Sequence, residues 1–191
     1  MAVNPSRRPP GPPGPERVEA FQLSDGREVV VRPIAPADAA PIAASYHLLH
    51  EDEVRRRFLH LLKVLDEAHL QKVTEPRAGS EFVVVAAEPL PPGDALVAAV
   101  ARLARETDAP GRAEFGILVS HFVAGLGLGR LLMQRLIEWC REQGVRELWG
   151  DVLEDNVAML ELASHLGFER EPLADSPGLV RVRLRLPILQ H

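Results

Sequence analysis

Residues 113–130 read AEFGILVSHFVAGLGLGR, an apolar strand that leads into three alternating glycines at the start of a long helix. Glycine lets the backbone approach a ligand closely and adopt positive φ. The first turn of a helix leaves N–H groups unpaired, and the helix dipole adds partial positive charge there. We therefore expect a phosphate or pyrophosphate site where Gly125, Gly127 and Gly129 meet the helix.

Two other phosphate-binding motifs fit this stretch incompletely. A Walker loop ends in Gly-Lys-Ser/Thr, whereas Arg130 and Leu131 follow Gly129 here, which excludes it. A dinucleotide fingerprint, Gly-x-Gly-x-x-Gly, has Arg130 at its third glycine and Asp151 about 20 residues further on as the ribose-binding acid. Only one further helix follows, so a dinucleotide-binding protein remains an alternative that lacks most of its usual fold.

The apolar pattern around this stretch predicts a mixed α/β domain. Asp25 and Gly26 between two β-prone runs indicate a hairpin. Strands are expected at 18–23, 28–31, 81–87, 95–104, 112–119, 147–153 and 179–186, and helices at 38–49, 51–65, 66–73, 125–144 and 155–166. Antiparallel strands come first, and a β-α-β-α-β segment comes last.

Length and composition indicate one domain with a short tail. The chain has 191 residues, 46% of them hydrophobic, and Pro and Gly crowd its start, so we expect a disordered tail at 1–16 and a domain at 17–191. No apolar run approaches the ~20 residues of a membrane helix, and we expect no secretory signal. A single cysteine, Cys140, excludes an internal disulfide. The net charge of -5 argues against nucleic-acid binding, and we expect a cytoplasmic protein.

Two motifs, in order, resemble the GCN5-related N-acetyltransferase (GNAT) family. The family's phosphate loop, Gln/Arg-x-x-Gly-x-Gly/Ala, is similar to residues 124–129, Ala-Gly-Leu-Gly-Leu-Gly. Its second signature, an asparagine before a helix that ends in Leu-Gly-Phe, is similar to Asn156 and residues 166–168. The resemblance covers most of 18–187. It implies the GNAT fold: a mostly antiparallel sheet that is splayed between its fourth and fifth strands and flanked by helices.

The resemblance also implies that acetyl-CoA is the cosubstrate and lies between the strands at 112–119 and 146–153. Its pantetheine arm is expected on backbone groups of Ile117, Leu118 and Val119. Its pyrophosphate is expected on the loop formed by Ala124, Gly125, Leu126, Gly127, Leu128, Gly129 and Arg130. Ala124 replaces the family's glutamine or arginine, and Leu126 stands at an often basic position; a backbone cradle needs neither side chain. Arg130 either contacts a phosphate or is a solvated helix residue.

Glu114 is the one carboxylate on the expected cleft strand, on the face of Gly116 and Leu118. Acetyl transfer needs a neutral amine, so a base there would assist it. The Ala-Glu-Phe run resembles the acetyltransferase domain of bacterial Pat-type protein lysine acetyltransferases, which implies that Glu114 is the base. A central strand predicts that Glu114 is buried; alternatively it pairs with Arg102 or Arg112. Gly116 indicates a bulge, a close backbone approach, or only a tolerated small residue.

The general acid is expected to differ from that of many relatives. They carry a tyrosine in the second-signature helix, whereas the corresponding residue is Ala163 and the single tyrosine is Tyr46. Asn156 is the remaining candidate, both as a catalytic residue and as a hydrogen-bond partner of the cofactor; the alternative is a helix cap. Cys140 is expected to pack in the core.

The acceptor implied by the Pat-type resemblance is a protein lysine. Asp25–Asp38 is similar to the opening of such domains, and Glu53–Phe58 is similar to their Arg-Phe helix. The three arginines of this helix contact an acidic partner or the CoA phosphates, or they form a solvated basic face. A small-molecule amine and a non-catalytic acyl-CoA-binding module are the alternatives. The histidines show no metal spacing, so we expect no metal, and His121 either touches ligand or lies on the surface. The expected assembly is a monomer or homodimer.

Overall fold

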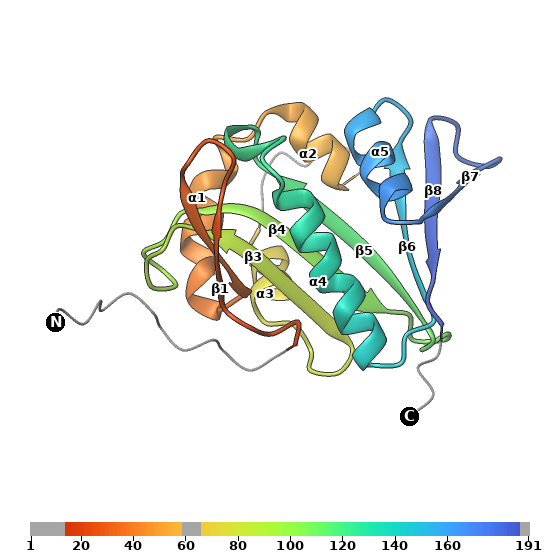
Figure 1. Ribbon diagram of the computed structural model, residues 1–191, viewed down its shortest axis with the longest axis horizontal. Coiled ribbons are helices and arrows are strands. Elements are labelled where there is room, and N and C mark those ends of the chain that lie inside the picture. The colour runs from red at the N-terminus through yellow and green to blue at the C-terminus, as the bar shows by residue number, and fades with distance from the viewer. Residues whose placement is uncertain (1–13, 59–65, 188–191) are drawn as a thin grey trace, which may run out of the picture.

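One mixed sheet of eight strands organises the computed structural model, which describes residues 14–58 and 66–187 (Figure 1). The strand order is β1-β2-β3-β4-β5-β6-β8-β7. The strands are β1 (Glu19–Gln22), β2 (Glu28–Pro33), β3 (Glu81–Ala87), β4 (Val97–Arg105), β5 (Arg112–Val119), β6 (Glu147–Leu153), β7 (Glu169–Pro172) and β8 (Leu179–Arg185). Every neighbouring pair is antiparallel except β5 and β6.

The middle of the sheet forms because its strands are apolar on the faces that helices cover. All seven residues of β3 are buried, and β4 alternates between buried and half-buried positions. The β1–β2 hairpin turns through Gly26, whose φ of 91° suits glycine. The mixed α/β prediction is therefore confirmed, and so is the hairpin.

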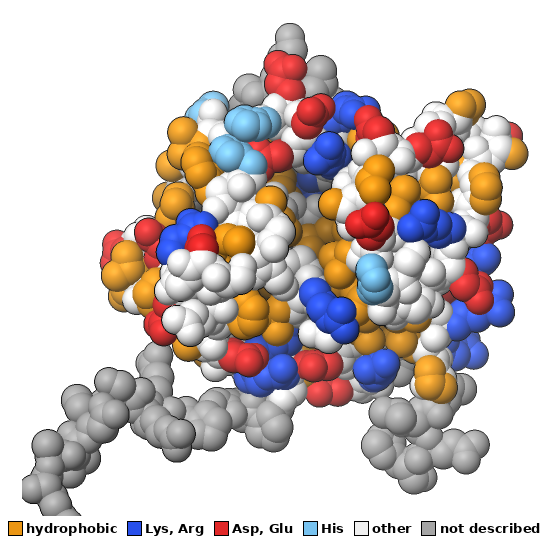
Figure 2. Space-filling view, turned by 45° about the horizontal axis from the view of Figure 1, so that its top comes forward, with side chains coloured by type: hydrophobic (Ala, Val, Ile, Leu, Met, Phe, Trp, Pro, Cys, Tyr) orange, Lys and Arg blue, Asp and Glu red, His pale blue; other side chains and the backbone are white. Residues whose placement is uncertain are grey.

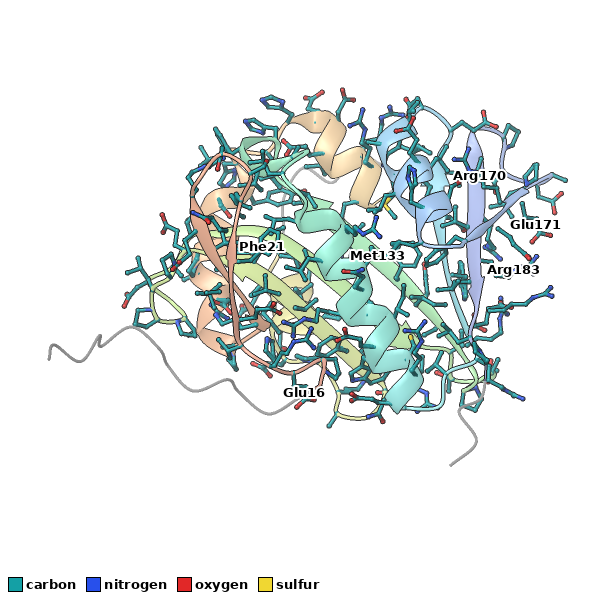
Figure 3. The ribbon with its side chains drawn as sticks, viewed as in Figure 1. Glu16, Phe21, Met133, Arg170, Glu171 and Arg183 are labelled. Atoms are coloured by element: carbon teal, nitrogen blue, oxygen red, sulfur yellow. The ribbon has the colours of Figure 1, made fainter. Side chains whose placement is uncertain are left out.

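Helices cover both faces of the sheet (Figure 1). They are α1 (Ala39–Tyr46), α2 (Glu51–Phe58), α3 (Glu67–Thr74), α4 (Leu128–Glu142) and α5 (Val157–His165), with short 3-10 turns η1 (Pro36–Asp38) and η2 (His121–Val123). The apolar side of α4 packs on β3, β4 and β5, and Met133 lies fully buried there (Figure 3). The helices α1 and α3 lie on the opposite face, where α2 packs on β5.

The sheet is splayed between β5 and β6, as expected from the family resemblance. Only Arg112–Glu114 pair with Glu147–Trp149, so the last five residues of β5 diverge from β6. This is also the single parallel pair among the described strands. A dinucleotide-binding fold has a mostly parallel sheet, so that alternative is wrong.

Several element boundaries differ from the sequence prediction for local reasons. The helix expected from Gly125 begins at Leu128, because Gly125 and Gly127 have φ of 76° and 94°, outside the helical region. The helix expected over 38–49 is replaced by η1 and the shorter α1. The edge strand β7 was missed, because all four of its residues are exposed and carry no apolar alternation.

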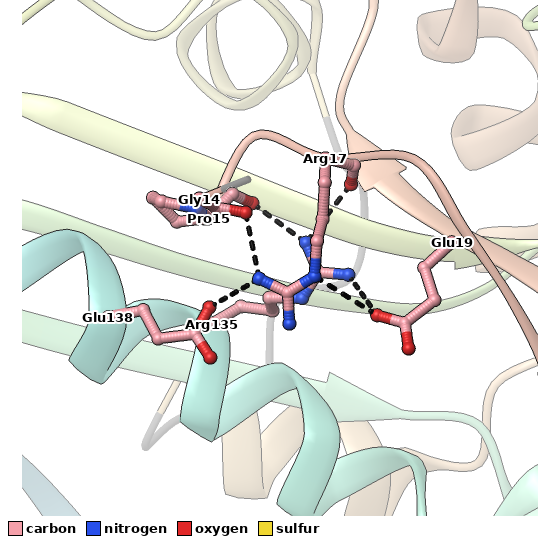
Figure 4. A network of polar contacts seen from close by, with 6 residues as sticks. All are labelled: Gly14, Pro15, Arg17, Glu19, Arg135 and Glu138. Atoms are coloured by element: carbon pink, nitrogen blue, oxygen red, sulfur yellow. Dashed lines mark hydrogen bonds and ion pairs between the residues drawn. The ribbon is translucent and has the colours of Figure 1, made fainter. Parts of the chain in front are cut away.

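A fully buried arginine fixes the start of the described chain to α4 (Figure 4). The Arg135 guanidinium donates to the main-chain oxygens of Pro15 and Arg17, both at 3.0 Å, and to Glu19 at 2.5 Å. Of the tail expected at 1–16, residues 1–13 lie outside the described residues, whereas Pro15 is buried in this contact. No helix within 14–58 or 66–187 is long and apolar enough to cross a membrane.

Candidate functional site

The glycine loop presents main-chain groups at the start of α4. Ser120 caps η2 by accepting from the Phe122 N–H, and the chain then turns through Gly125 and Gly127. No side chain within 14–58 or 66–187 caps α4, and its first bond runs from the Leu131 N–H to the Gly127 oxygen at 3.3 Å. The N–H groups before Leu131 therefore have no partner within the helix. This geometry, with the helix dipole, suits a bound anion.

Side chains of the loop point away from that cradle or into solvent. Leu128 is buried and Leu126 packs on the core, so their side chains hold the loop in place. Ala124 and Arg130 are exposed at the two ends of the loop. Phe21 of β1 lies under Gly127, 3.6 Å from the position that a Cβ would take (Figure 3). The cradle therefore consists of backbone, with Arg130 as the charged side chain beside it.

The cradle continues into the open edge of β5. Ala113–Val119 pair with β4 along one edge, and beyond Glu114 the other edge faces no strand. Ile117, Leu118 and Val119, the residues expected to bind pantetheine, are half-buried on this edge. In Figure 2, which brings this end of the sheet forward, a hollow with apolar side chains at its base and basic ones beside it lies in the middle of the face.

Phe115 holds the two strands apart where they begin to diverge. Its ring lies over Gly150 of β6, and a Cβ added at Gly150 would lie 2.8 Å from the ring. The ring is nearly buried and meets Phe168 edge-on, with the centroids 5.6 Å apart. Glycine is therefore required at 150, which the sequence analysis did not single out.

Glu114 lies on the face of the sheet opposite Phe115, and it is exposed. The expectation that this carboxylate is buried is therefore wrong. Its neighbour in the β5–β6 register is Trp149. The two predicted salt-bridge partners are engaged elsewhere, Arg102 with Glu81 and Arg112 with two other carboxylates. Among the described residues, Glu114 forms no ion pair and no side-chain hydrogen bond.

Gly116 makes room for a guanidinium beside Glu114. A Cβ at Gly116 would lie 2.7 Å from Cζ of Arg57, which reaches β5 from α2. The β4–β5 register runs past Gly116 without a shift, so the prediction of a bulge is wrong. The group that approaches Gly116 is the Arg57 side chain, whereas the sequence indicated an approach of backbone. Burial lowers the pKa of Arg57 to about 10; the charge of Arg102 adds to this, and that of Glu114 opposes it.

The three arginines of α2 take three different places. Arg55 pairs with Asp155 at 2.5 Å and so connects α2 to the start of α5. Arg56 is exposed, and Arg57 is half-buried on Gly116. A solvated basic face describes Arg56 alone.

Two histidines and a carboxylate meet where α2 approaches η2. Glu53 accepts from the His121 N–H and the His50 N–H, both at 2.6 Å, and contacts Nδ1 of His121 at 2.9 Å. The His50 and His121 rings stack with centroids 4.0 Å apart. Burial raises the pKa of Glu53, but the hydrogen bonds outweigh burial and leave it below its usual range. One ligand atom of each of the three residues lies within 4.8 Å of the others, a cluster that the spacing of the histidines in the sequence did not indicate.

The remaining candidates lie near the second signature. Asn156 is the N-cap of α5, where its Oδ1 accepts from the Met159 N–H at 3.3 Å. Ala163 is fully buried in the core, and Tyr46 is buried on the opposite face of the sheet. Cys140 is buried, as expected, and burial raises the pKa of its thiol to about 12.

A cavity of about 680 Å³ lies beside β4 and the end of β5, which the sequence did not indicate. The walls are mostly apolar and come from the β1–β2 hairpin, α1, the β3–β4 hairpin and η2. Leu118 and Arg57 line it too, so it borders the face that carries Glu114. Its size is in the range of small-molecule sites. Long-range packing forms it, and no local motif marks it.

Comparisons with known proteins agree with this geometry. The profile of the family described as acetyltransferase (GNAT) matches residues 46–168. An acetyltransferase of Pseudomonas aeruginosa is 28% identical over 154 residues, which are 78% of this chain and 81% of that protein.

Solved structures with the same fold include the GNAT domain of PAT from S. lividans. Its TM-score is 0.77 at 23% identity, and the match covers 88% of this chain and 97% of that domain. A cAMP-binding acyltransferase from Mycobacterium smegmatis is 27% identical with a TM-score of 0.60; 89% of this chain matches 47% of that one, so this chain spans about half its length. A putative acetyltransferase from Salmonella typhimurium, solved with its cofactor acetyl-CoA, has a TM-score of 0.62 at 21% identity.

Proposed function

The chain belongs to the acetyltransferase (GNAT) family, and on that premise we propose that it moves an acetyl group from acetyl-CoA directly to a primary amine, with Glu114 as the base. One observation carries the proposal. β5 bears Glu114, and its unpaired edge runs from there toward the cradle of main-chain N–H groups at the start of α4.

The residues present fit acetyl-CoA. A pyrophosphate needs several donors in a small space, and the unpaired N–H groups from Gly125 to Arg130 supply them without Ala124 or Leu126 side chains. The unpaired edge at Ile117–Val119 offers main-chain groups to the amides of a pantetheine arm. Acetyl-CoA, when bound, supplies an acyl group on a thiol leaving group.

Glu114 would take the proton that an amine must lose. An amine with a pKa near 10.4 costs about 4.6 kcal/mol to deprotonate at pH 7. An exposed carboxylate, without an ion-pair partner among the described residues, can accept that proton and pass it to solvent. Asn156 would contribute its Nδ2 amide as a donor to the cofactor or to a bound water, since Oδ1 is already engaged in the cap.

Two classes of acceptor have support. The resemblance of Glu53–Phe58 to the Arg-Phe helix of Pat-type domains favours a protein lysine. The apolar cavity beside Leu118 favours a small-molecule amine, because sites for small molecules are apolar cavities of about this size that enclose most of the ligand.

The first experiment is calorimetric titration with acetyl-CoA, with NADH as the control ligand. Saturable binding of acetyl-CoA alone is the expected result, and its absence would overturn the proposal. Thiol release with a panel of amines then separates an enzyme from a non-catalytic acyl-CoA-binding module, which would bind acetyl-CoA and release nothing.

Glu114→Gln tests the base, and Glu169→Gln, at an exposed carboxylate of β7, is the matched control. Loss of a positioned base lowers kcat at neutral pH by about 10²-fold or more, with the affinity for acetyl-CoA unchanged. The rate should recover as pH rises, since the amine then deprotonates without help. Equal rates in Glu114→Gln and the control would remove Glu114 from the mechanism.

A further inference from the structure

Large apolar side chains gather at the mouth of the cavity beside β4. Leu48, Leu90, Leu96 and Phe122 are each between 45% and 57% exposed, and all four line it. They come from the ends of α1, the β3–β4 hairpin and η2. Exposed apolar surface concentrated at one opening marks a binding site for an apolar group.

The inner end of the cavity carries a positive charge. Arg57 lines the cavity while its guanidinium lies on Gly116, one step along the same face of β5 from Glu114. Two residues along a strand span about 6.6 Å, so Leu118, Gly116 and Glu114 set out an apolar, a cationic and an acidic position in a row of about 13 Å. The charge of Glu114 raises the pKa of Arg57 and so opposes the effect of burial.

The other charged side chains that line the cavity lie away from Gly116. Arg27 is paired with Asp25, Glu88 accepts from the Leu96 N–H, and Glu28 is exposed at the start of β2; all three belong to hairpins away from Gly116. A guanidinium is planar, carries five N–H donors in a fork, and matches the geometry of a carboxylate.

We propose that the cavity binds the acceptor, and that the acceptor is an apolar or aromatic α-amino acid. Its side chain would fill the cavity, its carboxylate would meet Arg57 over Gly116, and its amine would lie beside Glu114. The amine nitrogen bonds to the acetyl carbon as the carbon–sulfur bond of acetyl-CoA breaks. The ammonium first gives one proton to Glu114, and the nitrogen gives a second to the departing thiolate, so that CoA leaves as the thiol. This inference rests on the proposed acetyl transfer and names the substrate class of the same site.

The test measures thiol release from acetyl-CoA with four acceptors, and mass spectrometry of the products. L-Phenylalanine is compared with phenethylamine, which lacks the carboxylate, with L-serine, which lacks the apolar side chain, and with a lysine peptide. The kcat/KM for phenylalanine should exceed that for phenethylamine by about ten-fold or more, as expected for a hydrogen bond to a charged group. It should exceed that for serine by about ten-fold or more as well, because serine has no apolar side chain to bury in the cavity.

Two variants assign the preference to the cavity. Arg57→Met should abolish the difference between phenylalanine and phenethylamine and leave the affinity for acetyl-CoA unchanged. Ser45→Phe fills the cavity from α1 and should raise the KM for phenylalanine about five-fold or more, whereas Ala44→Phe on the exposed side of α1 should not. Ser45→Phe tests the cavity independently of Arg57, whose replacement also removes packing on β5.

The outcomes separate this inference from the function on which it rests. Acetylation of the lysine peptide in preference to every free amine would overturn the amino-acid acceptor and leave acetyl transfer standing. Equal use of phenylalanine and phenethylamine by the unmodified protein would overturn the role of Arg57. Thiol release with none of the four acceptors, despite binding of acetyl-CoA, would count against the proposed acetyl transfer itself.

Discussion

Gly150→Ala and Gly116→Ala place the same methyl group on the two strands that diverge at the cleft. At Gly150 the new Cβ would lie 2.8 Å from Cε1 of Phe115. Carbon atoms pack at about 3.5–4.0 Å, so the ring and β6 must separate by about 0.7 Å or more. The ring is only 7% exposed and is held by Phe168, so it has no space to move into. Overpacking of this kind costs about 1–3 kcal/mol.

At Gly116 the contact is just as short but the neighbour is mobile. The Cβ would lie 2.7 Å from Cζ of Arg57, the far end of a flexible side chain that can swing away. Alanine also restricts the unfolded chain, which stabilises the protein by about 0.4–1 kcal/mol. We therefore expect the free energy of unfolding of Gly116→Ala to stay within about 1 kcal/mol of the unmodified protein.

Urea and thermal unfolding followed by circular dichroism decide between the two sites. For a chain of this size each kcal/mol moves Tm by roughly 2–4 °C, so Gly150→Ala should melt several degrees below Gly116→Ala. An unchanged Tm for Gly150→Ala, or an equal loss at both glycines, would refute the assignment of Phe115 as the rigid contact.

Three further results are expected. Hydrogen bonds outweigh burial and hold the pKa values of Asp38 and Glu53 below their usual range. In acid the folded state therefore binds fewer protons than the unfolded state. The stability that these two carboxylates contribute is present at neutral pH and is lost as pH falls below about 4. Urea unfolding between pH 7 and 3 should show that loss, and a flat profile would contradict it. Cys140 should react with a thiol reagent only after unfolding, because its thiol is buried and its pKa is raised to about 12. A chain that begins at Val18 removes both main-chain oxygens that accept from Arg135, so it should be less stable by about 1–3 kcal/mol in urea than a chain that begins at residue 14. Equal midpoints for these two chains would mean that water replaces the lost acceptors.

The sequence predicted the elements whose signals are local. β5 and β6 have the predicted bounds, because apolar residues fill them and turns flank them. α3 begins at Glu67, next to the predicted start at residue 66, because Asp66 caps it through the His69 N–H. The start of α4 was placed three residues early, because an apolar helical period continues through glycines whose φ is positive.

The site was less predictable because its parts are distant in the sequence. Alternation placed Glu114 on the correct face but could not show that this face is uncovered at the splay. The contact of Arg57 with Gly116 joins α2 to β5, and no local pattern distinguishes Arg57 from its neighbours on the helix. The cavity has the same origin, since six separate segments of the chain form its wall.

The short seam between β5 and β6 also has a mechanical consequence. Three residue pairs join the two strands directly, while β4 pairs with nearly the whole of β5 and β8 with the whole of β6. Fewer residue pairs thus join β5 to β6 than join either strand to its other neighbour. A ligand that is hydrogen-bonded to the free edge of β5 and also contacts β6 would connect the two strands where they do not pair with each other. Occupancy of the cleft would then register as slowed amide exchange along 115–119.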